Sequence, residues 1–451
     1  MLKTVAIGRE VTMREYEVLL RGEYQPMTGA TSIPVEDWDW LHDQSARIGD
    51  APAFFQPVFR SGIRALQARN YVGTVETPGG IRIEILPKLT GSGNALCDVR
   101  SIVLKMLRRV LSLNTYSWDK GALELMDQPL HEHLIEIFLS GVERLVKKGI
   151  RSNYVSKEAD HPFLRGRLRI EKQLHRRPGS KPEFAIEYHD YIPDRPENRL
   201  IHSAIIVVSK WTRSTNNQRR ARTLRFVFSE IPESTDHGRD LQQWSADRGL
   251  IDYRGLKPWC ELILTRQSPL FMAGKSSGLS FLFPMEQLFE RYVAAVLRKK
   301  MEPGFKLVTQ PSRHSLVTHQ GAKWFRLKPD LIVERPDGSC CSALDTKWKR
   351  LDERLDTAKD KYGLSQADFY QMAVYGERYL KGAGDMFLIF PRSPQFNRHL
   401  PHFELSPELR LWVVPFDLEK DEIDLPHTLG SGLTPSPVSG HVVATGGISV
   451  V

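Results

Sequence analysis

The stretch PDLIVERPDGSCCSALDTKWK, residues 329–349, places acidic residues at both ends of a predicted hairpin and a lysine near its second end. The Asp-Gly pair at 337–338 favours a tight turn because both residues tolerate positive φ. A turn centred on this pair places Asp330 opposite Asp345 on the facing strand. Lys347 follows Asp345 by two residues, so both side chains leave the same face of the strand. The hairpin therefore gathers two carboxylates and one ammonium group at one end.

Two facing carboxylates in a half-buried strand pair repel each other, and such a pair is destabilising unless a cation lies between them. Lys347 is one candidate for that cation, and a divalent metal ion is another. Oxygen ligands alone suit Mg²⁺ or Mn²⁺ better than zinc. The alternative is a structural salt bridge in a charged hairpin. The spacing of Asp330, Asp345 and Lys347 leaves these two interpretations equally open.

Two predicted helices flank the hairpin. The upstream helix carries Glu286 and Glu290 four residues apart, so they share a face and one of them could reach a metal ion. The downstream helix begins with a capping-box pattern at Ser365 and carries Gln371 and Tyr375, which also share a face. The helices thus offer further polar groups to the same end of the hairpin.

Composition gives weaker indications. The 451 residues are 41% hydrophobic, which is enough for two or three domains, and 63 Lys and Arg against 54 Asp and Glu give a net charge of +9. That excess is compatible with an anionic polymer as partner without requiring one. The four cysteines form no CxxC pair, which argues against a zinc cluster and fits a reducing compartment. Without a signal peptide or a run of about 18 apolar residues, we expect a soluble, cytoplasmic protein with no membrane partner.

The N-terminal half combines strand and helix patterns. Residues 71–77 and 81–88 predict a hairpin whose second strand has one apolar and one polar face. Apolar residues at three- and four-residue steps predict helices over 98–112 and about 130–148. The His-Glu-His triplet at 131–133 lacks the HExxH spacing, so we interpret it as ordinary first-turn residues.

Residues 141–181 are strongly basic, with twelve Lys and Arg against four acidic residues. Within them, Arg165, Arg167 and Arg169 fall on one face of a predicted strand, with apolar residues on the other face. A row of arginines could follow DNA phosphates or contact an acidic protein partner. It could equally be the solvated edge of a sheet.

The order of these patterns divides the chain. Residues 1–267 predict an α+β domain that engages a partner, and 268–280 read as a linker. Residues 281–426 alternate helices and strands and predict an α/β domain with a mixed central sheet flanked by helices. Residues 427–451 are rich in Gly, Ser, Pro and Thr, so we expect a disordered tail.

The order of a helical Glu290, a Pro-Asp strand ending at Asp330, an Asp-Thr-Lys strand at 345–347 and a Gln371-x-x-x-Tyr375 helix resembles the PD-(D/E)xK nuclease superfamily. The segments LFERYV, LKPDLIV, LDTKWK and DFYQMAVYG resemble McrC subunits of McrBC modification-dependent (5-methylcytosine) restriction systems. The N-terminal segments VGTVETPGGIRIEILPKL, FLRGRLRI and PENRLIHSAI are similar to that family as well, so the resemblance spans about 70–415.

The resemblance implies a Mg²⁺-dependent endonuclease. Asp330, Asp345 and the backbone carbonyl of Thr346 would hold the metal ion, and Glu290 would assist directly or through water. Lys347 would orient the attacking water or neutralise charge in the transition state. Two further side chains would position the DNA backbone: Gln371 and Tyr375.

The resemblance also implies a partner, a hexameric AAA+ GTPase that recognises modified double-stranded DNA and is stimulated by the N-terminal half of this chain. The sequence contains no G-x-x-x-x-G-K-[ST] loop, which agrees with GTP being bound by that partner. Two other readings remain. The chain could be a non-catalytic activator or binding subunit, or a free-standing DNA-repair nuclease.

Overall fold

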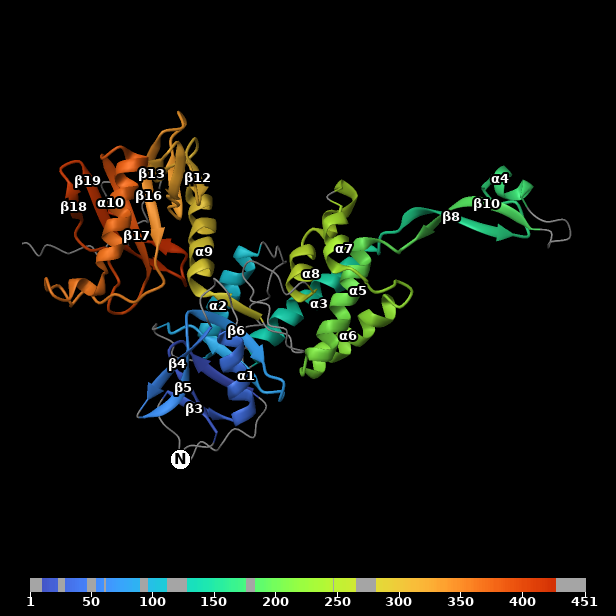
Figure 1. Ribbon diagram of the computed structural model, residues 1–451, viewed down its shortest axis with the longest axis horizontal. Helices are drawn as coiled ribbons and strands as arrows, with labels where there is room; N and C mark the ends of the chain where they lie inside the picture. The colour runs from blue at the N-terminus through green and yellow to red at the C-terminus, as the bar shows by residue number, and fades with distance from the viewer. Residues whose placement is uncertain are drawn as a thin grey trace, which may run out of the picture. The chain divides into compact units, whose positions relative to one another are not determined.

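The computed structural model of the chain describes residues 10–22, 29–46, 54–60, 62–89, 96–111, 128–175, 183–245, 247–264 and 281–426 (Figure 1). The chain forms two compact units. The first comprises Met1–Leu86 and Leu111–Phe283, and the second Pro87–Val110 and Pro284–Val451. The expected linker at 268–280 and the expected tail at 427–451 lie outside the described residues. No helix in the described part of the chain is long and apolar enough to span a membrane.

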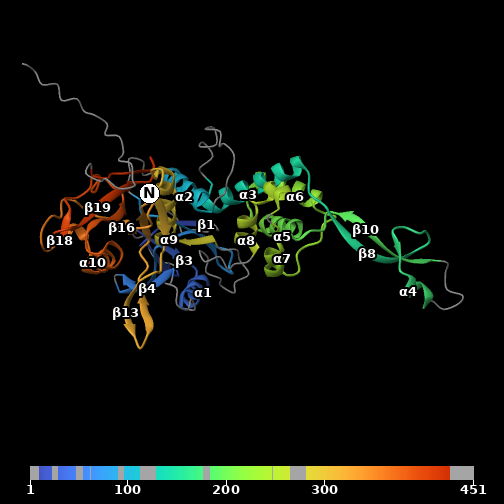
Figure 2. The same ribbon diagram turned by 90° about the horizontal axis from the view of Figure 1, so that it is seen from above.

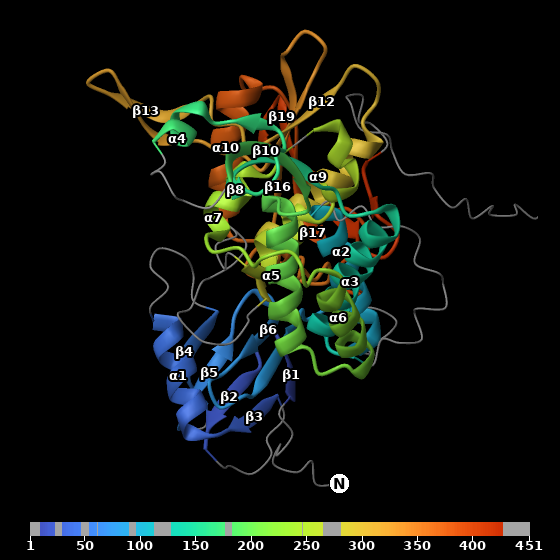
Figure 3. The ribbon, with the colours of Figure 1, turned by 90° about the vertical axis from the view of Figure 1, so that its right-hand side faces the viewer.

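The first unit contains two four-stranded sheets. The strands of one are, in spatial order, β1 (Glu10–Arg14), β7 (Arg82–Leu86), β6 (Tyr71–Glu76) and β11 (Phe281–Pro284). Those of the other are β3 (Ala30–Ile33), β2 (Val18–Arg21), β5 (Ile63–Ala68) and β4 (Phe55–Arg60). Helix α1 (Val35–Ala46) lies against the second sheet, as Figure 3 shows. Its Trp38 and Leu41 are buried in one cluster with Leu19 of β2. The predicted hairpin at 71–88 is confirmed as β6 and β7.

The polar face predicted for β7 is present, but it is covered rather than exposed to solvent. Every residue of β7 is buried. Arg82 ion-pairs with Glu76 and stacks over the ring of Trp211. Glu84 accepts hydrogen bonds from the Thr12 hydroxyl and from the backbone amide of Leu130. Alternation of polarity correctly identified the two faces, but the charged face is covered by other parts of the unit.

The remaining described helices of the first unit gather beside the strands. They are α3 (Leu130–Lys148), α5 (Pro196–Trp211), α6 (Thr215–Val227), α7 (His237–Gln243), the 3₁₀ helix η2 (Arg248–Tyr253) and α8 (Lys257–Leu264). The helix predicted at 130–148 is thereby confirmed. Its His131 and Glu132 lie in the first turn, as predicted, but both are buried, and burial lowers the pKa of His131 to about 3.

The basic region forms an antiparallel ribbon of β8 (Asn153–His161) and β10 (Phe184–Ile192), with the two-residue β9 (Arg167–Leu168) and α4 (Ile170–Leu174) beside it (Figure 1). The continuous strand predicted through the three arginines was wrong. Gly166 turns the chain at φ +76°, where a side chain would collide with the backbone of β10, and Ile170 begins a helix.

The three arginines consequently form no row. Arg165 lies over the ring of Tyr188 at 4.6 Å, and Arg169 ion-pairs with Glu158. Arg167 lies opposite Glu187 in the ribbon. Their expected contact with DNA or a protein partner stays a prediction.

The second unit is built on a seven-stranded mixed sheet. Its order is β12 (Lys306–Thr309), β15 (Leu331–Glu334), β16 (Cys340–Thr346), β17 (Gly384–Pro391), β19 (Leu409–Asp417) and β18 (Phe403–Ser406), with β20 (Glu422–Ile423) paired to β19. Strands β16, β17 and β19 run parallel and the others antiparallel. A separate hairpin, β13 (Ser315–His319) and β14 (Ala322–Arg326), lies between β12 and β15 in the chain. The expected mixture of α+β and α/β architecture is confirmed.

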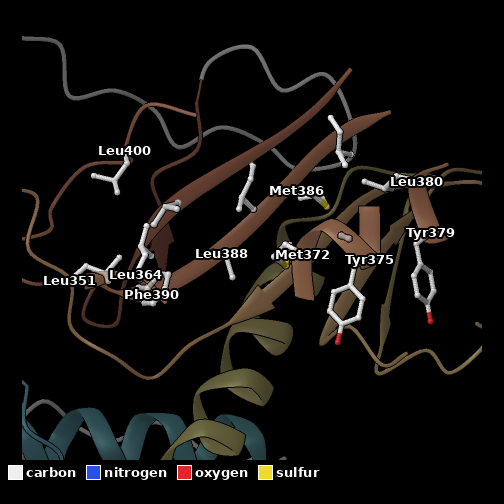
Figure 4. Close-up of a cluster of buried hydrophobic side chains, with 14 of the residues drawn as sticks. Leu351, Leu364, Met372, Tyr375, Tyr379, Leu380, Met386, Leu388, Phe390 and Leu400 are labelled. Carbon is white, nitrogen blue, oxygen red and sulfur yellow. The ribbon is translucent and has the colours of Figure 1, made fainter. Parts of the chain in front are cut away.

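Helices cover both faces of this sheet. Met386 and Leu388 of β17 pack in one cluster with Met372 and Tyr375 of α10 (Gln366–Leu380), shown in Figure 4. Phe387 is buried on the opposite face, where α9 (Met285–Lys300) packs against β12 and β16. The short 3₁₀ helix η3 (Lys361–Gly363) precedes α10. Because β17 is buried on both faces, its residues form a continuous apolar run.

Helix α2 (Leu96–Val110) also belongs to the second unit, although the sequence analysis assigned it to the N-terminal domain. It packs along α9. Lys105 and Arg109 each lie 2.7 Å from the carboxylate of Asp421, which also accepts a hydrogen bond from Tyr292 of α9. Local periodicity predicted this helix but carried no signal of which unit it joins.

The pairing of β6 with β11 depends on Gly73, which leads to a first prediction. Its φ is +133°, and a Cβ placed there would lie 1.6 Å from the carbonyl oxygen of Phe281. We expect Gly73→Ala to force the strands apart and to destabilise the chain by about 2 kcal/mol or more, seen as a lower Tm. The control is Gly255→Ala, where a Cβ meets no atom within 4 Å. An unchanged Tm for Gly73→Ala would contradict the pairing.

Candidate active site

The register of β15 and β16 brings Asp330 and Asp345 to the same end of the sheet. The strands pair Leu331 with Leu344, and Asp330 directly precedes Leu331. The two carboxyl groups interact strongly enough that Asp330 raises the pKa of Asp345. The predicted proximity of these residues therefore holds in the structure.

The turn itself is shifted by one residue from the predicted position. The amide of Gly338 donates to the carbonyl of Arg335, so Pro336 and Asp337 are the central residues, and Gly338 follows at φ +82°. A bulge at Val333–Glu334 then changes the register by one residue. The two irregularities cancel, which is why the prediction failed at the turn and succeeded at the aspartates.

Asp330 is held by Thr346. Its Oδ2 atom accepts hydrogen bonds from the Thr346 amide and hydroxyl, each at 2.7 Å. Burial raises the pKa of Asp330, and the hydrogen bonds from Thr346 and the charge of Lys347 act in the opposite direction. The sequence analysis considered only the Thr346 carbonyl. Its amide and hydroxyl are the contacts that orient the first aspartate.

Asp345, Lys347, Gln371 and Tyr375 form one connected chain of contacts. Lys347 Nζ lies 2.6 Å from Asp345 Oδ2 and donates to Gln371 Oε1 at 3.0 Å. The Gln371 amide donates to Asp345 Oδ1 at 3.3 Å and to the Tyr375 hydroxyl at 2.9 Å. The Tyr375 hydroxyl donates to the carbonyl of Lys328, two residues before Asp330. Strand β16 and helix α10 therefore fix the lysine together.

The carboxyl groups of this site are only partly neutralised by nearby positive charge. Burial raises the pKa of Asp345 to about 7, with the neighbouring Asp330 as second cause and Lys347 opposing both. Burial alone would lower the pKa of Lys347, but pairing with Asp345 and the field of Asp330 raise it overall. Apart from the ion pair with Lys347, Asp345 Oδ2 is a buried oxygen with no hydrogen-bond partner among the described residues. One lysine thus faces two carboxyl groups, one buried and one half-buried.

Glu290 of α9 lies at the edge of this group and is positioned by Gln310. The side-chain amide of Gln310 donates to Glu290 Oε1 at 2.9 Å. The backbone amide of Gln310 donates to the backbone carbonyl of Asp330, also at 2.9 Å. Burial, followed by the charge of Asp330, raises the pKa of Glu290 to about 7. Gln310 has φ +45° and ends an edge strand. No sequence pattern singled it out.

In the described ranges, no three side chains of the His, Cys, Asp and Glu types converge closely enough to hold a metal ion. Glu290 therefore does not complete a three-carboxylate cage with Asp330 and Asp345. The set expected from the sequence, two aspartates and one backbone carbonyl, requires only two carboxylates. The buried, under-neutralised Asp345 fits a hard divalent cation.

A family described as McrBC 5-methylcytosine restriction system component matches residues 66–391. No curated protein sequence matches the chain. Its fold is similar to a solved half-complex of a tetradecameric assembly of Thermococcus gammatolerans McrB AAA+ hexamers with bound McrC. The TM-score is 0.65 at 18% identity, over 90% of this chain and 94% of the other.

A cryo-EM structure of the Thermococcus gammatolerans McrBC complex is also similar, with a TM-score of 0.50 and 19% identity over 64% of this chain and 87% of the other. At these identities the structures support the fold alone, while the family match spans well over half of the 451 residues. The chain belongs to the McrBC 5-methylcytosine restriction system component family.

Proposed function

We propose that the chain is the endonuclease subunit of a GTP-dependent, modification-dependent (type IV) restriction complex. It would cleave DNA by Mg²⁺-dependent hydrolysis of phosphodiester bonds, with the second unit as a PD-(D/E)xK nuclease domain. The single observation that carries the proposal is the pairing of two aspartates, the half-buried Asp330 and the buried Asp345, with one lysine, which a helix-borne glutamine holds in place. Family membership supports the same reading.

The metal ion would be held by Asp330, Asp345 and the backbone carbonyl of Thr346, with Glu290 assisting directly or through water. When bound, Mg²⁺ supplies Lewis-acid polarisation of the phosphate and a lower pKa for its water. The chain prepares this site by orienting Asp330 through Thr346 and by leaving the ion pair with Lys347 as the one contact of Asp345 Oδ2 with a polar group in the described part of the chain. A cation there would offset the repulsion between the two carboxylates.

Lys347 has two roles available. Its raised pKa keeps it cationic at neutral pH, and it is about a quarter exposed, so it can meet a phosphate from solvent. In the transition state, a fixed ammonium group stabilises the charge that develops on the phosphate oxygens. It could also orient the attacking water. Gln371 holds the lysine and Tyr375 holds Gln371, so both act mainly by positioning.

The partner we propose is a hexameric AAA+ GTPase, the kind of protein named with McrC in the similar solved structure. This chain contains no G-x-x-x-x-G-K-[ST] loop, so GTP would be bound by the partner. The first unit would contact the partner and stimulate its GTP hydrolysis, while the second unit would cut the modified duplex.

The proposal is tested with the chain purified together with its AAA+ partner. The complex receives GTP, Mg²⁺ and duplex DNA that contains 5-methylcytosine. We expect Asp345→Ala to reduce cleavage by at least about 100-fold while GTP hydrolysis by the partner stays within about twofold, because the change removes a ligand of the metal ion in the second unit and leaves the first unit unaltered. Cleavage at the parental rate would show that the chain is an activator instead. Cleavage without partner and GTP would identify a free-standing nuclease.

Gln371 gives a second prediction. Gln371→Ala removes the hydrogen bonds that hold Lys347 and Tyr375, so we expect about a tenfold loss in the cleavage rate at saturating DNA. The matched control is Gln366→Ala on the same helix, whose side chain donates to the exposed Tyr370 hydroxyl. Equal activity of the two variants would contradict the positioning role.

The raised pKa of Asp345 gives a third prediction. A folded-state pKa of about 7, above the ordinary 3.8, means that the folded chain holds this proton more tightly than the unfolded chain. Its contribution to stability is complete below about pH 4 and is lost as the pH rises through 7. In EDTA at pH 8, we therefore expect Asp345→Asn to be more stable than the parent by roughly 2 kcal/mol, with the difference shrinking at pH 5.

Denaturant unfolding at both pH values measures this difference. The pH 5 measurement is the internal control, because it reports packing effects of the amide that do not depend on charge. A variant that is less stable than the parent at pH 8 would show that the carboxylate is not under electrostatic strain.

A further inference from the structure

The hairpin of β13 and β14 protrudes from the second unit as a two-stranded ribbon, as Figures 2 and 3 show. All residues of β14 and four of the five residues of β13 are exposed. A two-stranded ribbon with no sheet or helix against its faces is only marginally stable alone. Contacts at its base must therefore stabilise the ribbon, and its exposed surface is available to bind another molecule.

Large apolar side chains lie on this exposed ribbon. Trp324 is 48% exposed and Phe325 68%, and Leu316 and Val317 are exposed beside them. Trp324 contacts the ring of His319 at 4.7 Å. Phe325 has φ +56°, a conformation that is strained for an aromatic residue. Strain and exposed aromatic surface that serve no core are typical of a contact with another molecule.

The charge of this segment has one sign. From residue 303 to 329 there is no acidic residue, and the basic ones include Arg313, Lys323, Arg326 and Lys328. Lys323 and Arg326 belong to the exposed strand β14. Basic side chains interleaved with aromatic ones match an anionic polymer that has both phosphates and flat apolar groups.

The base of the ribbon is fastened to the helix that positions Lys347. Tyr379 of α10 donates to the carbonyls of Pro311 at 2.9 Å and Leu327 at 3.0 Å, one on each side of the ribbon. Arg378 donates to the carbonyl of Leu316 at 3.0 Å. Only Leu327, Lys328 and Pro329 separate β14 from Asp330. The ribbon is therefore held at a fixed position next to the candidate active site.

We infer that the β13–β14 ribbon binds in a groove of the duplex that the second unit cuts. Lys323 and Arg326 would contact phosphates, and Trp324 and Phe325 would lie against sugars and base edges. A two-stranded ribbon has the width of the DNA major groove. This inference rests on the proposed nuclease function and adds where the duplex lies relative to Asp330. Binding of a protein partner would explain the exposed apolar residues, but it would not explain why residues 303–329 contain no acidic residue.

The test measures binding of a duplex by the full chain carrying Asp345→Ala, which prevents cutting, over a range of KCl concentrations. With Lys323→Glu and Arg326→Glu added, we expect binding at least about tenfold weaker and a salt dependence reduced by about two counterions. With Trp324→Ala and Phe325→Ala added instead, binding should weaken with the salt dependence unchanged.

The matched control carries Lys306→Glu and Lys381→Glu, the same change in charge at the opposite end of the sheet. There Lys306 lies opposite Glu334 on the neighbouring strand, and Lys381 follows the last residue of α10. The control should bind DNA as the parent does. If the control weakened duplex binding as much as the ribbon variant does, the inference would be overturned, because the loss of binding would then follow from the net charge of the chain and not from the ribbon.

In the complex with Asp345 intact, the ribbon variants should cut at least about tenfold more slowly while stimulation of the partner's GTPase is kept. Unchanged DNA binding, or loss of the AAA+ partner in place of DNA, would overturn the inference and leave the nuclease function standing. That function fails separately if Asp345→Ala alone still cuts.

Discussion

The approach of two carboxyl groups, the half-buried Asp330 and the buried Asp345, is the constraint on which the second unit depends. Burial raises the pKa of both groups, the charge of Asp330 raises that of Asp345 further, and Lys347 compensates for only part of this cost. The surrounding elements hold the arrangement in place. Thr346 fixes one aspartate, and a capping box at Ser365 begins the helix that brings Gln371 to the other. An isolated structural salt bridge would not need this support.

The first unit shows how a buried charge looks when its role is structural. Burial alone would raise the pKa of Glu132, but hydrogen bonds from Thr212, Asn217 and the Arg213 amide lower it overall. That carboxylate is satisfied by neutral donors within the unit. Asp345 in the second unit has an oxygen with no such donor among the described residues. The contrast between two buried acids in one chain supports a cation site at the second and not at the first.

A structural feature could be predicted from the sequence where it depends on the spacing of residues along one helix or strand, or across one turn. The two-residue step from Asp345 to Lys347 and the four-residue step from Gln371 to Tyr375 determine shared faces whatever the rest of the chain does. The aspartate register was also predicted, although two irregularities in the hairpin had to cancel for this to hold. Burial of Arg82 and the docking of α2 on α9 could not be predicted, because both depend on contacts between segments distant in the sequence. Gln310 was missed for the same reason.

The central claim is that Asp330 and Asp345 together bind a divalent cation. Anomalous diffraction from crystals of the chain soaked in Mn²⁺ tests it most directly, since Mn²⁺ accepts the same oxygen ligands as Mg²⁺ and scatters anomalously. We expect a peak within coordination distance of both carboxylates and its loss in Asp345→Ala crystals. Saturating Mn²⁺ with no peak between these two aspartates would contradict the account.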